Sequence, residues 1–279
     1  MKLLTNHEIA EIMDAHIVWL RFGKCGGKRA DMSYDSIVGE SFYCSYFNEA
    51  NLAGTTLSEC YFEHCDFASA VLEFAVIKKC KFKDCTFKNV SLNNARISET
   101  AFINCDFKDA SMRSLNAERE VFNMCNLEHT YWNDACLMGS RFNSCEMTEL
   151  YLDANATDAE FNACKGFRPR FCRGNFIRAA FKECEFSMPY FNGSIIKGTK
   201  YIGCNIPNFE TDTETLITDE TIFERCIMGH VDVDTLGNAK IIDCKEHNVF
   251  PPEIKEKVNE LVSLCKKHGI SVDDIKFPD

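Results

Sequence analysis

Four cysteines are the first candidates for chemistry in this sequence. Cys60 and Cys65 are five residues apart, and Cys80 and Cys85 repeat that spacing further along the chain. Four thiolates are a common ligand set for a tetrahedral zinc ion, and paired thiols also serve redox chemistry. The spacing continues far beyond these four residues, however, so the elements that position them must be considered first.

The chain repeats with a period of five residues. Every fifth residue from Met32 to Leu152 is apolar, and after a one-residue slip near 155–158 the series resumes at Phe161 and runs to Ile206. A small residue stands two positions before most of the large ones. Neither a helix nor a flat strand has this period. A four-sided coil explains it, because each side of five residues then sends one large and one small side chain inward.

A second period, four pentads long, predicts columns inside such coils, since residue n lies beside residue n+20 of the next coil. The phenylalanine column begins at Phe42, continues through Phe62, Phe82, Phe102, Phe122, Phe142, Phe161 and Phe181, and ends at Tyr201. The cysteine column is Cys65, Cys85, Cys105, Cys125, Cys145, Cys164, Cys184 and Cys204. With coils about 4.8 Å apart, residues 30–206 form a rod roughly 43 Å long.

These pentads resemble those of the pentapeptide repeat family, whose motif is A-(D/N)-L-x-x. Ala30-Asp31-Met32, Ala50-Asn51-Leu52 and Cys105-Asp106-Phe107 match it. The resemblance implies an all-β solenoid, a right-handed quadrilateral parallel β-helix over 30–206 with degenerate last coils at 221–250. It also implies a function without catalysis. Acidic, dimeric members of the family, including quinolone-resistance proteins, resemble duplex DNA and bind DNA gyrase or topoisomerase IV.

Both ends of a solenoid expose strand edges that need a cover. Thr5 and Glu8 fit a capping box, and apolar residues follow at helical spacing, so residues 1–29 are predicted to hold a capping helix over 5–21. Pro251-Pro252 begins a second predicted helix within 251–279. Its apolar stripe is Ile254, Val258, Leu261, Val262 and Cys265. This helix either forms a homodimer, as in related proteins, or folds onto its own last coil.

An acidic stretch at 207–220 breaks the pentad rhythm and contains no basic residue. We expect it to form a projecting acidic loop, which either binds a partner or is a solvated insertion. Its candidate partner-binding residues are Glu210, Asp212, Glu214, Asp219 and Glu220. Other charges also occur in blocks, since 118–160 is mainly acidic and 165–182 contains only basic charges. Glu120 falls in an inward slot, so we expect either a distorted coil at 113–121 or an outward Glu120.

Composition argues against several functions. A net charge of −11 is unfavourable for direct nucleic-acid binding, and apolar runs fall short of the roughly 18 residues of a membrane span. The amino terminus lacks a signal-peptide core, so we expect a cytoplasmic protein with reduced thiols. The slots that hold Cys also hold Ala, Ser and Thr, which indicates selection for size rather than for metal binding.

The sequence therefore predicts a non-enzymatic protein without cofactor or metal, whose function is to bind a protein partner. His64 is the one histidine beside a column cysteine, and the repeat directs it outward while Cys65 points inward. Two kinds of partner remain open. One is DNA gyrase or topoisomerase, bound by mimicry of DNA, and the other is a partner unrelated to DNA topology, for which the rod is an adaptor or effector scaffold.

Overall fold

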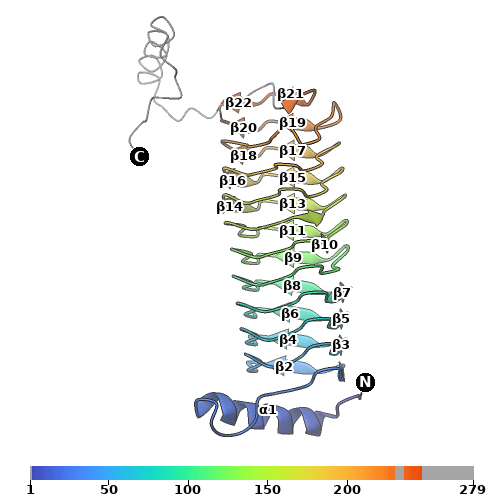
Figure 1. Ribbon diagram of the computed structural model, residues 1–279, viewed down its shortest axis with the longest axis vertical. Coiled ribbons are helices and arrows are strands. Elements are labelled where there is room, and N and C mark those ends of the chain that lie inside the picture. The colour runs from blue at the N-terminus through green and yellow to red at the C-terminus, as the bar shows by residue number, and fades with distance from the viewer. Residues whose placement is uncertain (1, 230–235, 247–279) are drawn as a thin grey trace, which may run out of the picture.

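The computed structural model describes residues 2–229 and 236–246, which form one rod of about ten stacked coils (Figure 1). Strands of successive coils pair in parallel, which confirms the predicted β-solenoid. The predicted helix at 251–279, with its dimerisation residues, lies outside the described residues. No helix of the described ranges has the length and apolar character needed to cross a membrane.

The largest sheet, here called the main sheet, has 11 strands and follows one side of the rod from end to end (Figure 1). Its strands in spatial order are β2 (Ser41–Tyr43), β4 (Tyr61–Glu63), β6 (Lys81–Lys83), β8 (Ala101–Ile103), β9 (Val121–Asn123), β11 (Arg141–Asn143), β13 (Glu160–Asn162), β15 (Ala180–Lys182), β17 (Lys200–Ile202), β19 (Ile222–Glu224) and β21 (Lys240–Ile242). The central residue of most of these strands is buried, so the outer surface consists of the two flanking residues and the corner that follows.

Three smaller sheets form parts of the other sides. The five-stranded sheet holds β14 (Lys165–Phe167), β16 (Glu185–Ser187), β18 (Asn205–Ile206), β20 (Ile227–Met228) and β22 (Lys245–Glu246). The four-stranded sheet holds β1 (Ser36–Val38), β3 (Thr56–Ser58), β5 (Val76–Lys78) and β7 (Arg96–Ser98), and a pair is formed by β10 (Ala135–Cys136) and β12 (Ala154–Asn155). Isolated parallel bridges, such as Asp66 with Thr86 and Val71 with Ser91, complete the sides.

The pentad follows from where the backbone turns. Two positions after most of the large inward residues comes a corner residue with positive φ, for example Glu49 at 61° and Gly54 at 64°. A hydrogen bond can close the corner, as where the Ala50 N–H donates to the Phe47 carbonyl at 2.9 Å. Backbone bonds between coils then pair the remaining groups. This pairing compensates for the unfavourable positive φ of non-glycine corner residues.

The inward residues fill the interior of the rod. Every fifth residue from Met32 to Leu152 is at most 9% exposed, as the repeat predicts. The rings of Phe62 and Phe82 stack 4.7 Å apart at an interplanar angle of 3°. Phe42 and Tyr201 stack at the two ends of this column, as the 20-residue period predicts, and the structure extends it to Phe223.

Coil length varies at three places. Ala135 pairs with Ala154, an offset of 19, because the corner near Asp153 is one residue short. Lys200 pairs with Ile222 at an offset of 22, and Ile222 pairs with Lys240 at an offset of 18. The in-register stacking of the main sheet is kept throughout, so the corners absorb the changes.

The stretch 207–220 is not a projecting loop, contrary to the prediction. Glu210 pairs with Tyr190, Leu216 pairs with Ile195, and Phe209 is buried. The offset between coils grows from 20 at Glu210 to 21 at Leu216 and 22 at Ile222, so the two extra residues are divided between two corners. Backbone pairing with the preceding coil therefore holds the acidic stretch in the wall of the rod.

The predicted capping helix is present as α1 (Asn6–Arg21), which lies across the N-terminal end of the rod (Figure 1). The Thr5 hydroxyl accepts the Glu8 N–H, and the Glu8 carboxylate accepts the Thr5 N–H, which completes the capping box. Buried residues of α1 are Ile9, Met13 and His16. His16 was not part of the predicted apolar face, and its ring joins α1 to the first coils by two hydrogen bonds.

Candidate protein-interaction surface

The side chains of the cysteine column pack inside the rod. It runs through ten coils, from Cys65 to Cys244, and each thiol lies 3.3–3.7 Å from a backbone carbonyl of the preceding coil, to which it donates. Cysteines of the described residues are free thiols. Burial raises the pKa of Cys125 and of Cys184 well above the ordinary range. A buried, protonated thiol is a poor nucleophile and a poor metal ligand.

The zinc-like spacing arises because Cys60, Cys65, Cys80 and Cys85 also fill small inward slots of the coils. All four are at most 3% exposed, and their thiols donate to backbone carbonyls as in the rest of the rod. Within the described ranges, the group of side chains that could hold a metal is instead Glu63, His64 and Asp84 on the outer surface. There Lys83 Nζ lies 2.6 Å from Glu63 and 3.7 Å from Asp84, so an ammonium group already pairs with both carboxylates.

Glu120 points inward at 3% exposure, so the expectation of an outward side chain is wrong. Its carboxylate accepts the N–H of Glu99 at 2.9 Å and the N–H of Thr100 at 2.7 Å. The corresponding corner of the previous coil uses a backbone carbonyl, since Lys79 N–H donates to Ser98. At this corner a carboxylate therefore replaces a backbone carbonyl as acceptor, and the four-stranded sheet ends one coil earlier, at β7.

We expect Glu120→Thr to gain stability relative to the wild type as the pH rises from about 4.5 to 8. Burial raises the pKa of Glu120, so the folded chain binds this proton more tightly than the unfolded chain. Wild-type stability then falls as pH rises through the raised pKa, whereas threonine does not titrate. Urea unfolding at both pH values measures the difference, with Glu118→Thr on the half-exposed surface of the same coil as control. An identical pH dependence in wild type and Glu120→Thr would contradict the assignment.

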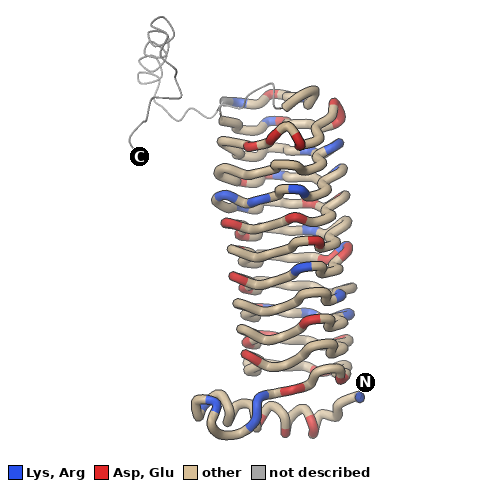
Figure 2. Tube along the Cα trace, viewed as in Figure 1, with Lys and Arg blue, Asp and Glu red and all other residues tan. Residues whose placement is uncertain are grey.

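The charge blocks of the sequence become adjacent bands in the structure. The six basic residues at 165–182 occupy one coil (Figure 2), and four of them pair with acidic residues of the coil before it. Arg173 lies 2.9 Å from Asp153, and Arg178 forms two bonds of 2.7 and 2.6 Å to Asp158. Because these pairs are exposed and water screens their charges, each contributes little to the stability of the fold. Their main effect is to neutralise charge along the rod.

The acidic partner-binding candidates are divided between structural and exposed roles. Asp212 accepts hydrogen bonds from the Gly193 N–H, the Glu214 N–H and the Thr215 hydroxyl, and these bonds lower its pKa. Glu220 lies 3.9 Å from Lys197, and Glu210 pairs with Tyr190 in the wall. Glu214 and Asp219 are exposed. Binding of a partner by these five residues stays a prediction.

A column of tyrosine and arginine on the outer surface was not predicted from the sequence. Arg113, Tyr131, Tyr151 and Arg170 occupy successive coils on the side bridged by Tyr131 and Tyr151, and they are called the Tyr–Arg column here. The tyrosine rings stack 5.0 Å apart, with the Arg113 guanidinium 5.9 Å from one ring and that of Arg170 4.7 Å from the other. Tyr and Arg dominate the binding energy of many protein interfaces. The recurrence of tyrosine in the same outward slot of two successive coils was the available sequence signal.

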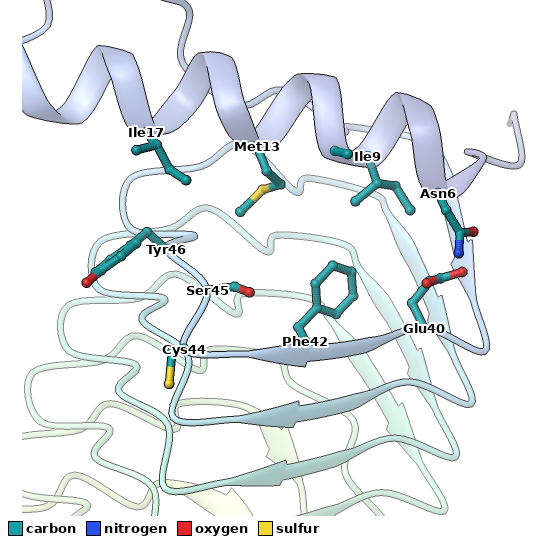
Figure 3. Close-up of a pocket in the computed structure, with 10 residues that line it drawn as sticks. Asn6, Ile9, Met13, Ile17, Glu40, Phe42, Cys44, Ser45 and Tyr46 are labelled. Carbon is teal, nitrogen blue, oxygen red and sulfur yellow. The ribbon is translucent and has the colours of Figure 1, made fainter.

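One cavity adjoins this part of the surface, and another adjoins the cap. A cavity of about 190 Å³ beside the Tyr–Arg column is lined by Tyr151, Arg170 and Cys172, among others. A larger one of about 340 Å³ lies between α1 and the first coil. Figure 3 shows Ile9 and Met13 projecting from α1 toward Phe42, which begins the phenylalanine column. The second cavity is thus part of the junction between helix cap and rod.

Comparisons with known proteins agree with the fold. The sequence model described as pentapeptide repeats matches residues 45–84 and 80–116 with eight copies. No curated protein matches the chain. Similar solved structures include HetL, a heterocyst-differentiation regulator from the cyanobacterium Nostoc sp. strain PCC 7120, at 13% identity and a TM-score of 0.34, covering 75% of this chain and 94% of HetL.

Two further similar structures belong to proteins whose functions differ from each other. A trypsin-treated form of QnrB1, a plasmid-mediated fluoroquinolone resistance protein, has 16% identity and a TM-score of 0.35 and covers 85% of this chain and 99% of its own. A mannuronic acid-specific polysaccharide lyase from human gut microbiota has 8% identity and a TM-score of 0.43, and the match covers 88% of this chain and 73% of the lyase. At such values no activity carries over. The matched repeats place residues 45–116 in the pentapeptide repeat family, and the same pairing of coils continues on either side of them.

Proposed function

We propose that the protein is a non-enzymatic interaction rod that binds a protein partner through the Tyr–Arg column. The observation that carries this proposal is the stack of Tyr131 and Tyr151 between two guanidinium groups on an outer side of the rod. The rings are held in place by the coils beneath them, so little conformational entropy is lost when they are covered. Burial of most thiols in the core supports a role without catalysis.

The side chains of the Tyr–Arg column are more exposed to solvent than those of the core. The column contains no carboxylate, so its arginines do not form ion pairs within it. Arg113 and Arg170 are exposed, and both rings are half-buried. Guanidinium groups stacked on rings keep their N–H donors free for carboxylates of a partner. We therefore expect a partner surface that offers carboxylates and an apolar patch together.

A pull-down from host lysate tests this proposal. Tyr131→Ala with Tyr151→Ala is expected to abolish capture of the specific partner, because two central aromatic contacts are removed. The matched control is Val76→Ala with Arg96→Ala, which removes one apolar and one basic exposed residue from β5 and β7 on another side. Undiminished capture by the tyrosine variant, or equal loss in the control, would refute a role for the column.

A narrower version names DNA gyrase or topoisomerase as the partner, through mimicry of DNA. It draws on the resemblance to gyrase-binding members and on acidic residues that recur in register, Asp66, Asp106 and Glu146. The arrangement also weakens this version, since Lys88 lies 3.1 Å from Asp106 and Lys108 lies 2.9 Å from Glu128. A gyrase supercoiling assay with a quinolone present distinguishes the two kinds of partner. If saturating protein neither inhibits gyrase nor protects it from the quinolone, topoisomerase is excluded as the partner and the adaptor role is left.

A further inference from the structure

The main sheet carries a charge-poor centre on its outer surface. Strands β8, β9 and β11 present six flanking residues, Ala101, Ile103, Val121, Asn123, Arg141 and Asn143, of which one is charged. In the whole chain 26% of residues are charged. Met124, at the corner after β9, is 56% exposed. Charged residues resume on β4 and β6 at one end and on β13 and β15 at the other, and a charge-poor centre with a charged rim is typical of protein interfaces.

We infer that this surface binds a second copy of the chain, face to face and antiparallel, about a two-fold axis parallel to β9. In that arrangement β9 faces β9, β8 faces β11, β6 faces β13 and β4 faces β15. The rotation keeps the strand direction, so a residue before the inward position faces the same kind of residue in the second copy. In-register pairing along the sheet therefore fixes which side chains meet.

The charges of the rim match in this register. Lys81 of β6 faces Glu160 of β13 in the second copy, and Glu63 of β4 faces Lys182 of β15. At the corners, His64 faces Glu183. Within one chain, Lys83 lies 2.6 Å from Glu63, and Lys182 lies 3.5 Å from Glu160. The second copy extends these existing pairs into a network across the interface, and the two-fold symmetry makes each of these rim contacts occur twice.

Alternative dimers, with the two-fold axis shifted by half a strand spacing or with the two rods parallel, bring like charges together. An axis between β8 and β9 places Lys81 opposite Arg141, and an axis between β9 and β11 places Lys83 opposite Lys182. A parallel arrangement of the two rods places Lys81 opposite Lys83. Like charges that face each other at an interface suppress the wrong pairing. The order of charges along the sheet thus selects the antiparallel register centred on β9.

The size of the surface predicts a weak dimer. Nine strands from β2 to β17 are about 4.8 Å apart, and three outward residues span about 10 Å, which gives on the order of 400 Å² per copy. A stable complex needs roughly 800 Å² per partner. We therefore expect a reversible dimer that forms at micromolar or higher concentration and weakens as salt screens the rim pairs.

Sedimentation velocity on the full-length chain, over a concentration series, tests the inference. Lys81→Glu and Glu160→Lys are each expected to raise the dissociation constant of the dimer about tenfold or more. Each substitution places two like charges opposite each other, at both symmetry-related positions of the interface. The double variant is expected to restore association. Val121→Glu, at the two-fold axis, is expected to leave a monomer. The control is Lys78→Glu, which reverses a charge of the same coil on β5, outside the main sheet. Circular dichroism confirms that each variant folds.

Three results would overturn the inference. The first is a wild-type chain that stays monomeric at about 200 µM, since even an interface of this size should then be populated. The second is a dimer that tolerates Val121→Glu or fails to recover in the double variant. The third is a dimer that ignores these changes and dissociates on Leu261→Asp, which would assign the contact to residues 251–279.

Discussion

Phe122→Ala is expected to lower the free energy of unfolding by about 3–5 kcal/mol, the usual range for a phenylalanine removed from a closed core. Its ring stacks 5.1 Å from Phe102 and 5.0 Å from Phe142 and meets Trp132 edge-on at 5.7 Å. The backbone around it is fixed by pairing on both sides, in β8 and β11. The coils cannot close over the void, so most of the cavity remains.

Urea unfolding followed by circular dichroism measures this loss. Met124→Ala is the matched control, because this side chain lies two residues away but is 56% exposed, and we expect it to change stability by less than about 0.5 kcal/mol. Phe42→Ala, at the end of the column and 9% exposed, should have a smaller effect than Phe122→Ala. Equal losses at Phe122 and Met124 would show that the column does not carry the stability of the rod.

His16→Ala is expected to detach α1 from the rod and to raise the rate of proteolysis within the helix. His16 Nδ1 accepts the Ala30 N–H at 3.1 Å, and Nε2–H donates to the Asn48 carbonyl at 3.0 Å. Alanine leaves both backbone groups without these partners, at a cost of about 1–3 kcal/mol each. Once α1 opens, the first coil presents an uncovered strand edge, so we also expect aggregation.

The same contact predicts a pH dependence. Burial lowers the pKa of His16, and protonation would place an N–H against the Ala30 N–H. A group whose pKa is lower in the folded chain contributes stability above its unfolded pKa of about 6.5 and loses it as the pH falls through the folded value. Hydrogen exchange of α1 amides at pH 7.5 and pH 5 measures this. Helix protection that is equal at both pH values in the wild type, or unchanged in His16→Ala, would rule out this role.

Much of the architecture was predictable because interior slots select residues by volume. Any residue of the phenylalanine column, such as Phe82, must fit between identical neighbours in the coils before and after it, so the repeat is visible in the sequence. The capping box of Thr5 and Glu8 was predictable for a similar local reason. His16 was not, because a histidine in an apolar stripe reveals its role only when Ala30 and Asn48 are seen to bind its two nitrogens.

The outer surface could not be derived in the same way. Its residues are not limited by packing, and their neighbours depend on the length of each coil, which differs along the rod as the offsets between paired strands show. The basic block at 165–182 resembled a positive patch in sequence, yet stacking pairs four of its six basic residues with acidic residues of the coil before it. The acidic stretch at 207–220 likewise lies in the wall because backbone pairing continues through it.

The sequence by itself determined the solenoid, its inward columns and the structural role of its cysteines, since a five-residue period with alternating small and large slots has one close-packed solution. The tertiary structure alone decided which outward side chains meet: the Tyr–Arg column, the paired charge bands, the carboxylate of Glu120 and the charge-poor centre of the main sheet. The physical reason is that contacts between coils join residues a full coil apart in the sequence, and only the folded coil brings them within reach of each other.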